Sequence, residues 1–265
     1  KTEIAARFGA ARAALRVRLS SLAGVTFAAM GMDRLVVHLH GAATGNRLFE
    51  QLFGRALGVI VRPVSARMER GDWQVTLGPE VIERVGLSAK EALLPFDARG
   101  FQGYRLLQEY FAFPRRFLFA AVGGLLPALR RCTDTQVDLI IPFSREDERL
   151  EGRVTRENIL PHCTPAVNIF PKRADRIFIT ERSSEFQVIA DRTRPLDYEI
   201  YKVLGVTGFG ARAEDEREFR SFYAASDADG TEEDEKGRRA YFMTHRTPRA
   251  ISERERRQGT RTSYA

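Results

Sequence analysis

Residues 35–61 read LVVHLHGAATGNRLFEQLFGRALGVIV, and they predict a strand, a helix and a second strand in close succession. Apolar side chains alternate with others over residues 35–40, which is the pattern of a strand with one buried face. Over residues 44–56 the spacing becomes helical, with an apolar stripe made of Leu48, Phe49, Leu52, Phe53 and Ala56. Gly58 follows the end of this helix, and the Val-Ile-Val run at 59–61 reads as a buried strand. The stretch therefore favours a fold that mixes helices with strands.

Patterns of the same two kinds continue on both sides of this stretch. Strands are predicted at residues 14–20, 73–77, 117–122 and 137–141, and further extended segments at 166–170, 176–180, 186–190, 198–206 and 240–244. Amphipathic helices are predicted over 103–113 and, from a capping box at Ser88–Glu91, ahead of Pro95. We therefore expect an α+β, strand-rich fold of two packed lobes with a few short amphipathic helices. The lobes are an α+β lobe at 1–140 and a mainly β lobe at 141–265.

The charge of the chain is unevenly distributed. Its 42 basic and 35 acidic residues give a net charge of +7, whereas residues 226–237 concentrate acidic side chains. We predict that this segment is a poorly ordered charged loop between two hairpin-like flanks, cut by proteases at Lys236, Arg238 or Arg239. The many arginines leave a nucleic-acid-binding module open as an alternative function. Their even spread along the chain fits local ion pairs as well.

Composition excludes several classes of protein. Two cysteines are too few for a disulfide scaffold or a four-cysteine zinc site. The longest uncharged stretch, residues 117–129, is shorter than the roughly 20 residues that a membrane-spanning helix needs, so no membrane insertion is expected. The chain opens on Lys1 rather than on a methionine, which predicts a piece of a longer protein.

The histidines and cysteines offer little for catalysis. His38 and His40 lie two apart on a predicted strand and would share one face, but a metal site needs three or four ligands. His162 and Cys163 are neighbours in a segment expected to be extended, so their side chains point to opposite sides and cannot form a nucleophile–base pair. We interpret the histidine pair as a half-solvated strand face and Cys163 as a small buried residue.

Two further patterns also lack the spacing of a functional motif. Gly205, Gly208 and Gly210 match neither dinucleotide-binding nor phosphate-binding loops, and they favour a turn between strands. Asp191 and Asp197 could act as paired carboxylates, but two arginines lie between them and favour ion pairing. No catalytic, cofactor-binding or metal-binding residue is therefore predicted, and no enzyme activity is expected.

Three longer motifs are distinctive in their order and spacing. They are GYRLLQEYFAFP at 103–114, PHCTPAVNIFPKRADR at 161–176 and DRTRPLDYEIY at 191–201. Together with residues 15–41 and Arg246–Arg249, they resemble the TssF (ImpG or VasA) family of baseplate subunits of the bacterial type VI secretion system. The resemblance covers most of the chain.

This resemblance implies a structural subunit of a contractile injection machine, similar to the wedge proteins of phage baseplates. The implied partners are TssG, TssK, TssE and another TssF copy, with sheath and hub components close by, and neither nucleic acid nor a cofactor is implied. The implied location is the bacterial cytoplasm, docked at the inner face of the cell envelope. Family members are longer than this chain and have no catalytic residues to carry over.

One cluster of residues is a candidate contact surface for such partners. Its members are Phe101, Tyr104, Tyr110, Phe111, Phe113, Arg115 and Arg116. Aromatic side chains and arginine are preferred anchors of protein interfaces. An amphipathic helix, however, usually turns its apolar face toward its own core. The sequence leaves interface and core equally open for this cluster.

Overall fold

The computed structural model describes residues 8–64, 73–96, 101–195, 197–210, 212, 215–222 and 240–247. Within these residues it contains four α-helices and eleven strands, and all strand pairings but one are antiparallel. The expected strand-rich α+β fold is confirmed. The chain divides into two compact units, which are called here the first unit (1–167) and the second unit (168–265).

The first unit contains most of the regular structure. Its strands are β1 (Ala13–Ser20), β2 (Leu35–Leu39), β3 (Val59–Pro63), β4 (Val75–Leu77), β5 (Ile82–Arg84), β6 (Phe119–Val122), β7 (Gln136–Phe143) and β8 (Ile159–Pro161). Its α-helices are α2 (Phe27–Met30), α3 (Ala42–Gly54), α4 (Gln102–Ala112) and α5 (Leu126–Leu129). Short 3₁₀ helices are η1 (Pro79–Val81), η2 (Ala89–Glu91), η3 (Pro114–Phe117) and η4 (Arg156–Asn158). The described strands of the second unit are β9 (Val206–Phe209), β10 (Glu216–Ser221) and β11 (Tyr241–Phe242).

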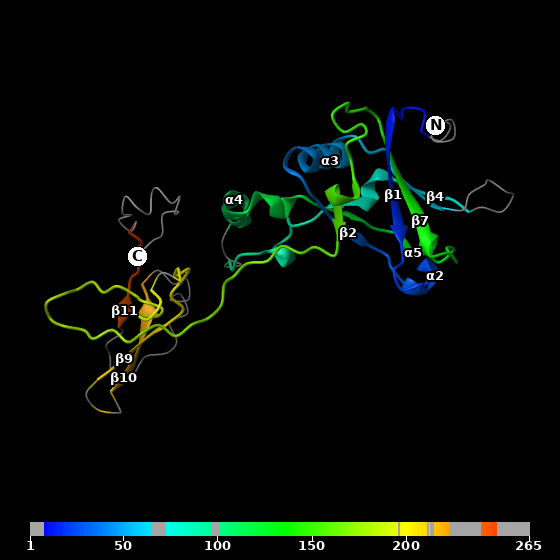
Figure 1. Ribbon diagram of the computed structural model, residues 1–265. Coiled ribbons are helices and arrows are strands. Elements are labelled where there is room, and N and C mark those ends of the chain that lie inside the picture. Colours follow the sequence, from blue (N-terminus) through cyan, green and yellow to red (C-terminus); the bar gives the residue numbers. More distant parts are fainter. Residues whose placement is uncertain are drawn as a thin grey trace. The chain divides into compact units, whose positions relative to one another are not determined.

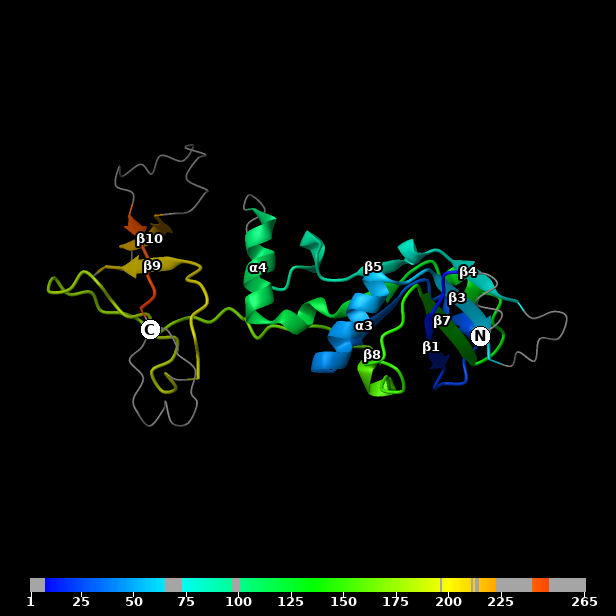
Figure 2. The ribbon, with the colours of Figure 1, turned by 90° about the horizontal axis from the view of Figure 1, so that it is seen from above.

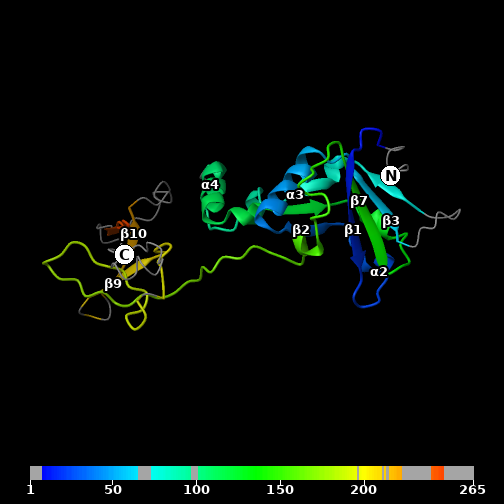
Figure 3. The same ribbon diagram turned by 45° about the horizontal axis from the view of Figure 1, so that its top comes forward.

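The first sheet of the first unit has the strand order β1-β7-β3-β4 (Figures 1 and 3). β7 lies in its middle and is buried from Val137 to Phe143. β1 lies at the edge and alternates between half-buried and exposed residues, as its sequence predicts. Its Arg18 forms two hydrogen bonds to the buried carboxylate of Asp138, at 2.9 and 3.1 Å. The charge on the otherwise apolar strand β7 is therefore paired.

The second sheet has the order β5-β6-β2-β8, and α3 packs against β2 and β5 (Figure 2). Its apolar side chains share one core with those of the first sheet. This core includes Leu39, Leu48, Leu52, Val59, Val61, Ala120, Val122, Leu139 and Ile141. The strand, helix and strand predicted over residues 35–61 thus line the core, and they connect the two sheets.

Gly45 explains how closely α3 approaches β2. It is buried in the first turn of the helix, and a Cβ atom placed on it would lie 2.6 Å from the carbonyl oxygen of Leu39. Any other residue would therefore push the helix away from the strand. Gly54, in the last turn of α3, has no atom within 4 Å of the corresponding position.

The second unit is organised differently. β10 pairs with β9 antiparallel and with β11 parallel. The segments predicted as extended at 166–170, 176–180 and 186–190 form no strands, because no neighbouring segment among the described residues pairs with them in a ladder. One backbone hydrogen bond, from Asp175 N–H to the carbonyl of Ile189, joins these segments at 3.0 Å. Alternation of apolar residues thus predicted extended backbone, which becomes a strand only with a partner.

The boundary between the two compact units follows β8. β7 passes through residue 140 and pairs with β1 and β3, while β8 pairs with β2, so both strands belong to sheets of the first unit. In the sequence, the first unit ends at Val167 and the second begins at Asn168. The lobes at 1–140 and 141–265 stay a prediction. The charged loop at 226–237 also stays a prediction, because it lies outside the described residues.

Candidate assembly surface

Helix α4 turns its charged side chains inward and its aromatic side chains outward. Arg105 and Glu109 are 5% and 1% exposed, whereas Phe101, just before the helix, and Phe111 are 74% and 81% exposed. Other exposed apolar members of this face are Tyr104, Leu107 and Tyr110. We call this set, Phe101, Tyr104, Leu107, Tyr110 and Phe111, the α4 surface. In all three ribbon views α4 stands clear of the two sheets of the first unit (Figures 1–3).

A buried cluster of charges holds α4 in this orientation. The carboxylate of Glu109 accepts a hydrogen bond from Arg105 at 3.0 Å and is paired with the guanidinium of Arg116. Its other oxygen accepts the backbone N–H groups of Leu93 and Leu94, at 2.9 and 3.0 Å. A buried carboxylate satisfied by two arginines and two amides is stable in place, whereas removal of one partner leaves a buried charge uncompensated.

Arg116 joins this cluster to the loop that follows β5. It donates hydrogen bonds to the carbonyl oxygens of Gly86 and Glu91, at 3.0 and 2.8 Å. Burial, together with repulsion from Arg105, lowers the pKa of Arg116 from its ordinary value, although nearby Glu91 acts against this. The Arg116 guanidinium thus connects α4, the loop after β5 and η3, and these three segments support the α4 surface.

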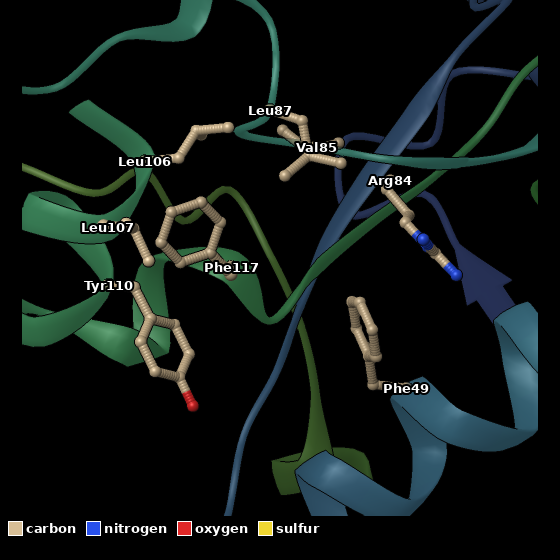
Figure 4. Close-up of a pocket in the computed structure, with 8 residues that line it drawn as sticks. All are labelled: Phe49, Arg84, Val85, Leu87, Leu106, Leu107, Tyr110 and Phe117. Carbon is tan, nitrogen blue, oxygen red and sulfur yellow. The ribbon is translucent and has the colours of Figure 1, made fainter. Parts of the chain in front are cut away.

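An apolar groove separates α4 from α3 (Figure 4). Its volume is about 320 Å³, and it is lined by Phe49, Arg84, Val85, Leu87, Leu106, Leu107, Tyr110 and Phe117. Arg84 is the one charged residue in this lining, and its guanidinium lies over the rings of Phe49 and Phe53, 5.9 and 5.2 Å from their centroids. The described residues offer Arg84 no carboxylate partner. The groove is therefore apolar with a single cationic edge.

The two histidines lie close together without other metal ligands. His38 and His40 have ring centroids 5.8 Å apart, and the His38 ring packs on Phe119 at 4.7 Å. Burial, the neighbouring His40 and Arg115 lower the pKa of His38, against a hydrogen bond to the Arg115 carbonyl that raises it. No group of three or more potential metal ligands occurs in the part of the chain that the structure describes.

The remaining candidate residues are dispersed. Cys163 is exposed, so its interpretation as a buried residue is wrong, and His162 beside it has a positive φ of 59°. Gly208 lies inside β9 rather than in a turn. Asp197 pairs locally with Arg194 at 3.9 Å, whereas Asp191 pairs with the more distant Lys172 at 3.4 Å.

Of the sequence candidates, the aromatic members of the cluster are exposed together on and beside one helix, whereas Arg116 of the same cluster is buried. The sequence left the orientation of the cluster open, and the signal that decides it is the pair Arg105 and Glu109 on the opposite side of the helix. Two oppositely charged residues four apart, flanked by apolar positions, can bury as a pair if further partners satisfy them. No helix among the described residues combines the length and the apolar composition that crossing a membrane requires.

An uncovered aromatic face is typical of proteins that assemble with other proteins. The family model of the type VI secretion system protein TssF matches residues 1–264, and the chain belongs to this family. It is 45% identical over 258 residues to the type VI secretion system component TssF1 of Pseudomonas aeruginosa. That match covers 96% of this chain and 39% of the relative.

A solved structure is similar as well. It is the cryo-electron microscopy structure of the type VI secretion system TssK-TssF-TssG baseplate subcomplex, one chain of which matches with a TM-score of 0.57 and 25% identity. The match covers 82% of this chain and 39% of the other. The chain thus spans 39% of the length of each relative, and the resemblance drawn from the three sequence motifs is confirmed.

Proposed function

We propose that this chain is a structural part of a type VI secretion baseplate and that it assembles there with TssK and TssG. The observation that carries the proposal is the family match over residues 1–264. The likeness to a chain of the TssK-TssF-TssG subcomplex supports it independently. The exposed α4 surface gives such an assembly a physical basis, because aromatic side chains supply much of the binding energy at protein interfaces.

The finer parts of the proposal concern further partners, place and chemistry. A second TssF copy and TssE are proposed as additional contacts, with sheath and hub components nearby. The location proposed is the cytoplasmic side of the cell envelope. The role proposed is assembly without turnover, and the family match supports it.

Nucleic-acid binding, the alternative that the arginines left open, has no support from the relatives found. Several arginines also form ion pairs with carboxylates of the same chain. Arg18 with Asp138, Arg47 with Asp147 and Arg105 with Glu109 form ion pairs at 2.9, 2.9 and 3.0 Å. An arginine paired in this way neutralises no phosphate.

Co-purification tests the proposal directly. The native protein is co-expressed with TssG and TssK of the same bacterium, purified through a tag on TssG and separated by size-exclusion chromatography. We expect the three proteins to elute together at micromolar concentration. Separate elution of this protein would overturn the proposal. TssE and a differently tagged second copy are then added to test the finer contacts, and a salt-dependent gel shift with duplex DNA tests the alternative.

A further inference from the structure

The α4 surface has the spacing of a helix-packing face. Tyr104, Leu107 and Phe111 lie at positions i, i+3 and i+7, so they form one stripe over two turns. Residues 101–114 contain only two charged residues, Arg105 and Glu109, and both are buried. The outward face of this segment therefore carries no charge, whereas an ordinary surface helix places its charged residues there.

The observed orientation of α4 is lower in energy than the orientation that would bury its aromatic face. Rotation of α4 about its axis would bury its aromatic side chains. It would also remove Glu109 from its contacts with Arg105, Arg116 and two backbone amides. Breaking such a buried cluster leaves an uncompensated buried charge and is strongly destabilising. The charges behind the apolar stripe thus hold it outward, and the elements of the first unit that the structure describes leave it uncovered.

The groove beside the stripe indicates what shape that chain has. One wall is α4, with Leu107 and Tyr110, and the other is α3, with Phe49 (Figure 4). The side chains of Val85, Leu87 and Phe117 complete the lining. A groove between two helices accepts a third helix, whose own residues at i, i+3, i+4 and i+7 enter it.

The charge at the groove indicates the chemistry of the occupant. Arg84 is the single charged residue in the lining, and the described residues supply it with no carboxylate. Its position over two aromatic rings holds the guanidinium at the edge of the groove. A carboxylate on the occupant would pair with it there, while a basic occupant would be repelled.

We propose that the groove between α4 and α3 binds an amphipathic helix of a partner subunit in the baseplate. Aliphatic side chains of that helix pack against Leu107, Tyr110 and Phe49, and an Asp or Glu of the helix pairs with Arg84. This assignment rests on the proposed function, because it takes the partner from the assembled baseplate. It goes further in naming the surface, the shape of the partner segment and the sign of its charge.

Photo-cross-linking identifies the occupant. p-Benzoylphenylalanine is placed at Tyr104 or Leu107 of the native protein, in a complex reconstituted with TssG, TssK and TssE. The matched control carries it at Glu148, which is exposed on a loop of the same unit. We expect cross-links from the two α4 positions to one partner peptide with apolar residues three and four apart and an acidic residue beside them. Cross-links to a second copy, to another part of the same polypeptide or to a basic peptide, or a yield no higher than at Glu148, would overturn the proposal.

Charge reversal tests the role of Arg84. We expect Arg84→Glu to weaken binding of the partner found by cross-linking at least about tenfold, and Arg84→Lys to weaken it much less. Exchange of the partner's carboxylate for lysine should restore binding to Arg84→Glu. Arg130→Glu, at an exposed arginine beside α5, is the matched control and should bind as the wild type does.

The apolar contact is tested by Leu107→Asp, which places a charge on an exposed position and leaves the buried cluster intact. We expect a loss of at least about tenfold in affinity with an unchanged thermal unfolding midpoint. If the wild type binds its partners and both Leu107→Asp and Arg84→Glu bind equally well, the groove proposal is wrong while the proposed function stands. If the wild type does not join TssG and TssK at all, the proposed function is wrong.

Discussion

The two units of the chain differ in how far their apolar side chains are buried. The first unit buries side chains from both sheets and from α3 in one core, and Val61 and Val137 there are fully inaccessible to solvent. Among its described residues, the second unit buries no side chain at all, and Phe178 and Leu204 are 82% and 79% exposed. Burial of apolar surface is the main stabilising contribution to a fold. The first unit therefore has a core that stabilises it, whereas the apolar side chains described in the second unit stay exposed.

The strongest way to test this contrast is to break the buried charge cluster of the first unit. Glu109→Ala leaves Arg105 and Arg116 buried without their carboxylate, so we expect a loss of about 3–5 kcal/mol in the free energy of unfolding. Urea unfolding followed by the fluorescence of Trp73, which packs against the core and is the single tryptophan, measures it. Glu148→Ala, at an exposed position, is the control and should change little. A loss below about 1 kcal/mol for Glu109→Ala would contradict the structural role of the cluster.

A matched pair of leucines tests the contrast itself. Leu139→Ala in β7 empties a site that is 2% exposed, and we expect a loss of about 2–5 kcal/mol. Leu204→Ala in the second unit should change stability by less than about 0.5 kcal/mol, since that side chain is already in water. Urea unfolding followed by far-ultraviolet circular dichroism reports on both units. Equal losses in the free energy of unfolding for the two substitutions would contradict the difference in burial between the two units.

Two glycines in α3 test how closely this helix packs against β2. Gly45→Ala puts a methyl group against the Leu39 carbonyl, so we expect a loss of about 1–3 kcal/mol. Gly54→Ala meets no atom within 4 Å and should stabilise the helix, by at most about 1 kcal/mol. Thermal unfolding compares the two variants. A neutral Gly45→Ala would mean that α3 can move away from β2 without cost.

The smallest expected effect concerns pH. Because burial lowers the pKa of His38 below its ordinary value of about 6.5, the folded chain binds fewer protons near that pH than the unfolded chain does. Stability contributed by His38 therefore rises with pH and is lost as pH falls from 7.5 toward 5. His38→Gln should flatten this part of the profile of unfolding midpoint against pH. A wild-type profile in which the unfolding midpoint rises as pH falls from 7.5 toward 5 would contradict the assignment.

The elements of the first unit were largely predictable because both periodicities are strong there. The strands at 14–20, 35–40, 59–61 and 137–141 and the helices at 44–56 and 103–113 all appear, with ends displaced by a few residues. The capping box of Ser88 and Glu91 is present as well. These signals are local, since each depends on residues within one turn or one strand.

What could not be predicted depends on contacts between distant residues. The burial of Arg105 and Glu109 on the inward face of α4 depends on partners outside the helix, namely Arg116 and the amides of Leu93 and Leu94. By itself, the apolar stripe predicts that the aromatic face of α4 is buried, whereas the structure buries the charged face. In the second unit, alternation predicted strands where the described residues supply no partner strand. The family resemblance came from motifs and not from these contacts, so it was recognisable although the surface was not.

The order of strands in the first sheet has a consequence for how the protein is made. β7 lies between β1 and β3, yet it is the last of the four strands to leave the ribosome. The ion-paired residues Arg18 and Asp138 are 120 residues apart, so β1 emerges long before the strand it pairs with. During that interval a half-apolar strand stays without a neighbour, and pairing over such distances is slow and prone to aggregation. Synthesis through β7 therefore sets the earliest moment at which the first sheet can close.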